Sequence, residues 1–330
     1  MITIGKCPYR VSLLGGSSDL DWFVKEKGFG ACLGFSLNHY SYSVINILPA
    51  NAKKGILEYS TREIYSSIND IVHPIVREAL IEINKSRFIE LKTFGFASGG
   101  SGLGGSSSFV ISLLSSLYAA FEIKINAKQI IEKACFIEIN KLKKPIGKQD
   151  QYLCANKGIN SFTFLDNNKV KENYLSKNML TTLRRLANDF YLIPTHKTRN
   201  ADTVLSNIRS NPKSLDQILE IRSIASKFLS FEDDRDSNIE ELFHNSMRDS
   251  WEIKKSMSNV MTKTLSEQYE EIKKLIPNNW IRLIGAGRGG YFLVSTKLQK
   301  DQINKFSNQK CIKGIFKATI SDEGLSILRV

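Results

Sequence analysis

Residues 98–108 read Ser-Gly-Gly-Ser-Gly-Leu-Gly-Gly-Ser-Ser-Ser, and this is the most informative segment of the sequence. An apolar run at 88–96 precedes it as a predicted strand, and residues 107–122 come after it as a predicted buried helix. A glycine-rich turn between a strand and a helix points backbone N–H groups and the positive end of the helix dipole into one concavity. We therefore expect a polyphosphate to bind here. A flexible surface linker is the alternative, and the apolar elements on both sides argue against it.

The residues around the glycines constrain the type of phosphate loop. No Lys-Ser or Lys-Thr pair comes after the last glycine, so the P-loop pattern is absent. The dinucleotide fingerprint matches twice, at 100–105 and at 285–290. The second match runs into a predicted strand, and the first comes after several strands, whereas a nicotinamide-binding domain usually begins with it. A dehydrogenase is therefore the minority interpretation.

Composition limits the class of protein. The chain has 330 residues, of which 42% are hydrophobic and 24% charged, which excludes a disordered protein and leaves room for two domains. Five scattered cysteines without a Cys-x-x-Cys pair argue against a disulfide framework and favour a cytoplasmic location. We see no export signal and no apolar run of about 20 residues, so no membrane association is expected. The net charge of +13 is spread along the chain, which favours small anionic substrates over nucleic acid.

The order of predicted elements indicates an α+β protein. Short β-branched or apolar runs predict strands at 1–4, 9–14, 31–35 and 41–48. A helix is expected from Asn126, capped with Gln129, to about Leu142. After a strand at 161–164, amphipathic helices are expected around 215–229 and across 242–276, and strands at 280–284 and 291–295. We predict two domains, residues 1–170 and 171–330.

Two acidic residues are candidates for chemistry at the phosphates. On a helical wheel Glu138 lies at the centre of the apolar stripe, where a carboxylate is costly unless it is paired with a cation. Asp150 lies twelve residues later, in a predicted glycine-containing turn. A magnesium–nucleotide site needs a hard oxygen ligand, and a kinase needs a group that orients the attacking hydroxyl. The alternatives are a structural salt bridge for Glu138 and an ordinary turn residue for Asp150.

The N-terminal segment offers a further polar set. Arg10 lies on a predicted strand, and Asp19 comes after the glycine pair Gly15-Gly16. An arginine at a strand start is ordinarily a surface residue, and such an aspartate is ordinarily a loop cap. Together they could hold a polyol against the phosphate loop, the guanidinium for charge and the carboxylate for hydroxyl groups.

Three segments in this order resemble the GHMP small-molecule kinases, which include galacto-, homoserine, mevalonate and phosphomevalonate kinases. KCPYRVSLLGGSSD (6–19) resembles their first motif, 98–108 their phosphate loop, and RLIGAGRGG (282–290) their third motif. Within the superfamily the likeness is greatest to D-glycero-D-manno-heptose 7-phosphate kinases. It is carried by GGSSD (15–19), GKQDQY (147–152), THKTRNAD (195–202) and SWEIKKSM (250–257).

The resemblance implies a two-domain fold, an N-terminal α/β domain with the phosphate loop and a C-terminal α+β domain, with ATP between them. It implies Mg²⁺ on Ser106 and Glu138, Asp150 as base or orienting anion, and Arg10 stabilising charge near the attacking hydroxyl. The implied nucleotide-binding residues are Gly99, Gly100, Ser101, Gly102, Leu103, Gly104, Gly105, Ser106 and Ser107. The implied substrate-binding residues are Asp19, Gly16, Lys148, Gln149, Arg199, Gly287 and Arg288.

The implied reaction is phosphorylation of the anomeric hydroxyl of heptose 7-phosphate, giving the 1,7-bisphosphate for a nucleotide-activated surface sugar. Three positions depart from the family pattern: Ser98 replaces a usual proline, Gly105 a usual Ser or Thr, and Arg288 a glycine. Kinases of other sugars, such as fucose or galactose, stay open as alternatives. So do a catalytically lapsed sugar- or nucleotide-binding regulator and a basic RNA-binding protein. The partner expected is a small sugar or sugar phosphate, with no nucleic acid and no membrane, and a homodimer is left open.

Overall fold

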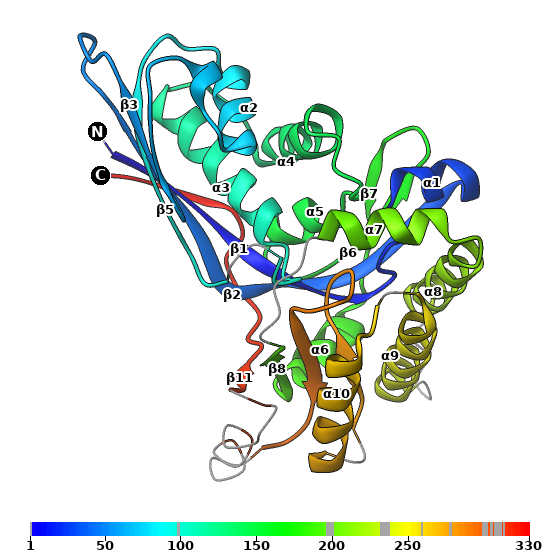
Figure 1. The fold of residues 1–330 in the computed structure, drawn as a ribbon. Coiled ribbons are helices and arrows are strands. Elements are labelled where there is room, and N and C mark those ends of the chain that lie inside the picture. Colours follow the sequence, from blue (N-terminus) through cyan, green and yellow to red (C-terminus); the bar gives the residue numbers. More distant parts are fainter. Residues whose placement is uncertain are drawn as a thin grey trace.

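Two sheets with helices packed on them form the protein, as the computed structural model in Figure 1 shows. The structure describes residues 2–97, 100–195, 201–231, 238–258, 260–276, 279–298, 303, 306, 312 and 314–330. The predicted α+β fold is confirmed. In the described part of the chain, no helix combines the length and the apolar character that crossing a membrane requires.

The larger sheet is built around two long antiparallel strands. β1 (Ile2–Leu14) merges the predicted strands at 1–4 and 9–14, and β2 (Phe29–Ile47) merges those at 31–35 and 41–48. The β1–β2 register shifts between Pro8 and Tyr9, so the ladder is interrupted there without the strand ending. The order is β12-β1-β2-β5-β3-β4, and β6 and β7 extend from the other half of β2. The bounds are β3 Gly55–Glu58, β4 Arg62–Tyr65, β5 Ile89–Gly95, β6 Ile159–Leu165, β7 Val170–Glu172 and β12 Ser326–Arg329.

Helix α3 (Gly105–Ala120) packs against β1 and β2, buried along nearly its whole length. The serines of α3 have small side chains, so the helix approaches the strands closely. One of them also bonds to a strand, since Ser108 Oγ donates to the Cys7 carbonyl at 2.8 Å. The neighbouring helices are α2 (Pro74–Ile83), α4 (Ala127–Cys135) and α5 (Gln149–Ala155), all near α3 in Figure 1. The predicted capping box of Asn126 and Gln129 is confirmed, and α4 continues as a π-helical turn, Phe136–Lys141.

The smaller sheet has the order β11-β8-β10-β9. Its strands are β8 Phe190–Pro194, β9 Ile281–Leu283, β10 Tyr291–Ser295 and β11 Phe316–Lys317. The predicted strands at 280–284 and 291–295 are confirmed as β9 and β10. The accompanying helices are α6 Lys177–Ala187, α7 Ala201–Ser210, α8 Ser214–Leu229, α9 Ile239–Ser256 and α10 Lys263–Leu275, so the predicted helical stretch at 242–276 is two helices. Near the start of the chain, α1 spans Asp21–Lys27 and a 3-10 turn spans Ile68–Asp70.

The two sheets share a hydrophobic core. Buried residues of β1 and β2 belong to one cluster with those of β8 and β10, and the Phe35 and Phe190 rings lie 6.3 Å apart. The chain leaves the larger sheet after β7 and returns to it as β12, which pairs with β1. The proposed domain boundary at 170 stays a prediction.

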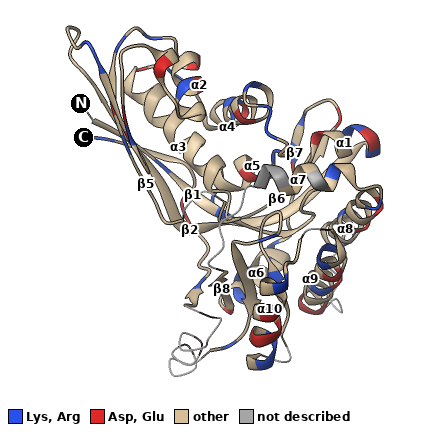
Figure 2. Cartoon of the chain, viewed as in Figure 1, with Lys and Arg blue, Asp and Glu red and all other residues tan. Residues whose placement is uncertain are grey.

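Basic and acidic side chains are mixed on the surface helices, as on α1, α9 and α10 in Figure 2. This distribution agrees with the spread of lysines along the sequence.

Candidate active site

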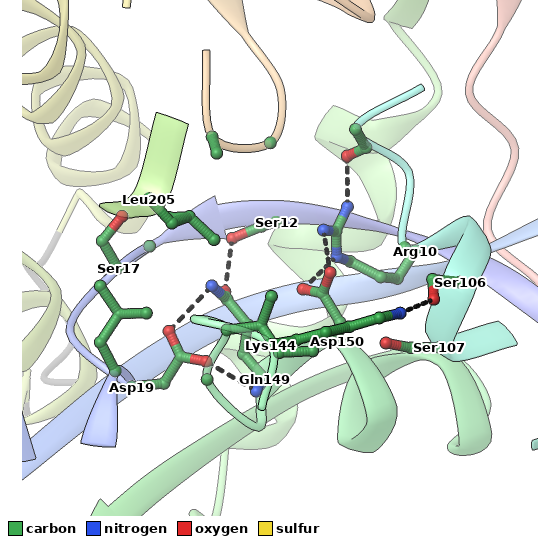
Figure 3. Close-up of a pocket in the computed structure, with 18 of the residues that line it drawn as sticks. Arg10, Ser12, Ser17, Asp19, Ser106, Ser107, Lys144, Gln149, Asp150 and Leu205 are labelled. Carbon is green, nitrogen blue, oxygen red and sulfur yellow. Dashed lines mark hydrogen bonds and ion pairs between the residues drawn. The ribbon is translucent and has the colours of Figure 1, made fainter. Parts of the chain in front are cut away.

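A cleft lies where the phosphate loop, the C-terminal part of β1 and residues from the second half of the chain meet (Figure 3). Its walls come from both halves of the chain. The lining residues are Arg10, Ser12, Gly16, Ser17, Asp19, Leu20, Gly100, Gly102, Gly104, Gly105, Ser106, Ser107, Glu138, Lys144, Ile146, Gly147, Gln149, Asp150, Leu205, Lys254, Gly285 and Ala286.

The phosphate loop reaches this cleft with three glycines in the left-handed region. Gly100, Gly102 and Gly104 have φ between 74° and 79°, and α3 begins directly after them, two residues earlier than predicted. Leu103 is fully buried and its carbonyl accepts a bond from the Arg10 N–H at 3.0 Å, which fixes the loop to β1. Ser101 and Leu103 are buried and do not line the cleft, whereas Gly105, Ser106 and Ser107 line it at the helix start. Ser98 and Gly99 lie outside the described residues.

Glu138 is completely buried, as its position on the apolar stripe predicted. Ser106 Oγ donates to its Oε1 at 2.6 Å, and Ser107 Oγ and Gln151 Nε2 donate to its Oε2 at 3.0 and 2.7 Å. The Lys144 ammonium donates to Oε1 at 2.9 Å and to Ser106 Oγ at 2.8 Å. The salt bridge considered as an alternative role is therefore present, together with the pairing to Ser106.

The oxygens at this point fit a hard divalent cation. A carboxylate and a hydroxyl are ligands that Mg²⁺ prefers, and Mg²⁺ commonly takes one or two protein ligands with waters and phosphate oxygens completing the shell. A positive group, the Lys144 ammonium, already lies against both oxygens. Among the described residues, no group of three or more His, Cys, Asp or Glu side chains is placed to hold a metal. A cation here would therefore depend on the nucleotide for further ligands.

Arg10 and Asp150 form a two-point ion pair beside the loop. Arg10 Nε donates to Asp150 Oδ1 at 2.9 Å and Nη2 to Oδ2 at 2.6 Å, while Nη1 donates to the Gly102 carbonyl at 2.5 Å. Arg10 is 4% exposed; burial lowers its pKa, but the Asp150 carboxylate outweighs this and raises it above the usual value. The predicted turn at Asp150 was wrong, because the residue lies in the first turn of α5. The helix therefore aims this carboxylate at the cleft.

Asp19 and Gln149 make the opposite wall. The Gln149 backbone N–H and its Nε2 donate to the Asp19 carboxylate at 2.8 and 3.0 Å, and Ser12 Oγ donates to Gln149 Oε1 at 3.0 Å. Burial raises the pKa of Asp19 to about 7, partly opposed by the Gln149 N–H, while the Asp150 charge raises it further. A Cβ at Gly147 would lie 2.0 Å from Asp19 Oδ2, so only glycine lets the loop close on this carboxylate.

Of the other proposed substrate-binding residues, only some line the cleft. Gly16 lines the cleft, whereas Lys148 donates to the Asn168 carbonyl at 3.2 Å and lines a neighbouring hollow. Gly287 packs against Val260, and Arg288 is exposed, with φ 61° and its N–H bonded to the Val260 carbonyl at 2.7 Å. The structure therefore does not bring Lys148, Gly287 and Arg288 into the lining of this cleft. Arg199 lies outside the described residues.

Several residues that line the cleft or bond to its side chains were missed from the sequence. Lys144 and Gln151 bond Glu138, and Lys254, inside the 250–257 segment, donates to the Gly285 carbonyl at 2.5 Å. Ser12, Ser17 and Leu205 also line the cleft. Lys144 had a local signal, because it lies six residues after a buried carboxylate and directly before Pro145.

Comparison with known proteins agrees with this geometry. Residues 74–158, which include α3, Glu138 and Asp150, match the GHMP kinases N terminal domain. The curated D-glycero-alpha-D-manno-heptose 7-phosphate kinase of Campylobacter jejuni is 25% identical over 308 residues, covering 86% of this chain and 86% of the relative.

Solved structures show the same fold. A D-glycero-D-manno-heptose 1-phosphate kinase from Bacteroides thetaiotaomicron superimposes with a TM-score of 0.70 at 19% identity, covering 100% of this chain and 99% of that one. The Methanococcus jannaschii mevalonate kinase gives a TM-score of 0.72 at 16% identity, covering 96% and 98%. The predicted resemblance to GHMP kinases, and to the heptose-phosphate kinases among them, is confirmed.

Proposed function

We propose that this protein is an ATP-dependent kinase that phosphorylates a hydroxyl group of a sugar or sugar phosphate. One observation carries the proposal. In a single cleft, a Ser106–Glu138 cation site at the start of α3 lies near the Arg10–Asp150 pair, next to the polar wall of Asp19 and Gln149. The match to GHMP kinases and the curated kinase relative support the same activity.

The nucleotide side of the cleft is the phosphate loop. The backbone N–H groups at the start of α3 and the helix dipole stabilise phosphate oxygens there. Ser106 and Glu138 would hold Mg²⁺, which when bound neutralises charge on the β- and γ-phosphates. The backbone bond from the Arg10 N–H to the Leu103 carbonyl keeps the main chain of the loop in place, so the loop backbone needs little rearrangement when phosphates bind.

The acceptor side depends on Asp150. Its carboxylate would accept a hydrogen bond from the attacking hydroxyl and receive the proton as the oxygen bonds to the γ-phosphorus and the bond to ADP breaks. Arg10 fixes both carboxylate oxygens, and its guanidinium offsets charge on the transferring group. Asp19 and Gln149 would bind further hydroxyl groups of the sugar.

For the acceptor we propose D-glycero-D-manno-heptose 7-phosphate, phosphorylated at the anomeric hydroxyl to give the 1,7-bisphosphate for nucleotide-sugar and surface polysaccharide synthesis. The name of the Campylobacter jejuni relative supports this choice. The Bacteroides protein is named a heptose 1-phosphate kinase, so the position of the existing phosphate needs a direct comparison.

The test is ADP release from MgATP with a panel of acceptors: heptose 7-phosphate, heptose 1-phosphate, unphosphorylated heptose, fucose and galactose. We expect heptose 7-phosphate to give the highest kcat/KM. A better acceptor elsewhere in the panel would change the substrate but keep the sugar kinase. Tight ATP binding with no stimulation by any sugar would overturn the kinase and favour a lapsed regulator.

A further inference from the structure

We propose that Lys144 is a tethered counter-cation: its ammonium holds the metal position in the nucleotide-free protein and leaves when the metal arrives with a nucleotide. This inference rests on the proposed function, since it concerns the same cleft. It gives Lys144 a role that the sequence motifs do not include.

The two cations need the same oxygens. The Lys144 ammonium lies 2.9 Å from Glu138 Oε1 and 2.8 Å from Ser106 Oγ, which are the two oxygens proposed as metal ligands. Figure 3 shows the Lys144 side chain extended across the cleft to Ser106. A divalent ion bound to both oxygens at about 2.1 Å would stand in the place of the ammonium. Binding of the metal and this position of Lys144 therefore exclude each other.

Glu138 needs a positive charge even without metal. Its side chain is 0% exposed, and an uncompensated buried carboxylate is strongly destabilising. Among the residues that the structure describes, its other hydrogen-bond partners are Ser106, Ser107 and Gln151, all neutral. Lys144 thus supplies the charge that stabilises Glu138 in the nucleotide-free protein.

Lys144 is placed so that it can leave without moving the main chain. Its backbone N–H donates to the Glu138 carbonyl at 3.0 Å, which fixes the loop, while the side chain is 20% exposed. A lysine carries its charge on a flexible four-carbon stem, so the ammonium can turn toward a phosphate oxygen in the same cleft. A metal ion arriving alone gives Lys144 no new partner, whereas a metal–nucleotide complex does. Metal and nucleotide binding should therefore be coupled through Lys144.

The test is metal binding to the protein without nucleotide or sugar. Mn²⁺, observed by electron paramagnetic resonance, would be titrated into the wild type and Lys144→Met. We expect Lys144→Met to bind Mn²⁺ at least about tenfold more tightly, because the competing cation is gone. Lys143→Met is the matched control, since it removes the same charge from the adjacent exposed residue, and it should bind Mn²⁺ like the wild type. Lys144→Arg keeps a cation and should stay weak.

Two further measurements make the result unambiguous. Adding Glu138→Gln to Lys144→Met should abolish the gain, which locates the ion at Glu138. MgCl₂ alone should raise the melting temperature of Lys144→Met more than that of the wild type. If Lys144→Met does not fold without metal, Lys144→Gln replaces it in both measurements with the same expected gain.

Unchanged or weaker Mn²⁺ binding in Lys144→Met, relative to wild type and Lys143→Met, overturns the inference. Because the titration contains neither ATP nor sugar, this failure is distinct from failure of the proposed kinase, which would show as absent ADP release from the wild type.

Discussion

Asp150 bonds to Arg10 through both carboxylate oxygens, and its side chain has no bond to Ser106 or Glu138, the proposed metal ligands. Asp150→Asn should lower kcat about 100-fold or more, because the attacking hydroxyl loses its proton acceptor. The dissociation constant for MgATP should change little, because the proposed metal ligands keep their own partners. Stopped-flow turnover and a nucleotide titration measure the two quantities.

The control for that variant is Asp166→Asn, an exposed aspartate on the loop after β6, which should keep full turnover. Full activity in Asp150→Asn would remove Asp150 from the mechanism.

The raised pKa of Asp19 predicts a pH dependence of stability. The native carboxyl holds its proton up to about pH 7, whereas in the unfolded chain it ionises near pH 3.8. The native state thus binds more protons between these values, so this residue's stabilising contribution is present below pH 3.8 and lost as pH rises to about 7. Urea unfolding should therefore show that the free energy of unfolding of the wild type, measured relative to that of Asp19→Asn, is lower at pH 8 than at pH 5. A constant difference between the two proteins would contradict the raised pKa.

The positions of site residues were predictable where a motif or a periodicity marked them. Glu138 was recognised as a buried carboxylate because its position on the apolar stripe results from helical geometry alone. The ion pair between Arg10 and Asp150 could not be predicted from the sequence, since these residues lie 140 positions apart and only the fold brings them together. The resemblance of residues 147–152 to the kinase signature implied a substrate-binding role for Lys148, but consecutive residues at a helix start point in different directions, and Lys148 lies outside the lining of the cleft.

At the scale of elements, the third motif supports the phosphate loop directly. A Cβ at Gly290 would lie 2.3 Å from the Ser101 carbonyl oxygen, and φ there is +105°. Gly290→Ala should therefore displace the loop and weaken ATP binding about tenfold, or about 1.4 kcal/mol. A fluorescence titration with a nucleotide analogue measures the effect.

Gly28→Ala separates loop displacement from backbone strain. Gly28 also has a positive φ, +80°, but nothing lies within 4 Å of its Cβ position. This variant should lose some stability and bind ATP normally. Equal nucleotide affinities in the two variants would show that Gly290 does not act through the loop.

Helices and strands were predicted well where a single hydrophobic pattern runs through the segment, and poorly where the residues suit both a helix and a turn. The strand, loop and helix around 98–108 were found because an apolar run ends abruptly at glycines. α5 was missed because its seven residues come after Gly147 and carry polar side chains at their start, a pattern shared by turns. The π-helical turn at Phe136–Lys141 has no separate sequence signature, although it carries Glu138.

At the scale of the whole molecule, the two sheets share one core and should unfold together. Phe190 of β8 is buried against Phe35 of β2. Phe190→Ala should cost about 3–5 kcal/mol, the range for deleting a large buried side chain. When unfolding is followed by circular dichroism and by tryptophan fluorescence, the two probes should give the same midpoint within each protein, and the midpoint of the variant should be lower than that of the wild type.

The exposed Phe94 provides the comparison. Phe94→Ala removes the same ring from a surface position and should change stability by about 0.5 kcal/mol or less. Separate midpoints for the two probes would mean that the sheets unfold independently.

The pairing of β12 with β1 has a practical consequence for handling the protein. Ile2 and Val330 exchange two backbone hydrogen bonds of 2.9 Å, and the two ends emerge side by side in Figure 1. Eight residues of extended chain, about 26 Å, separate Ile2 from Arg10. An affinity tag or surface tether at either end therefore starts well away from Arg10 and the cleft that it lines. A short peptide joining the two ends would allow new termini to be opened elsewhere, with β1 and β12 still paired.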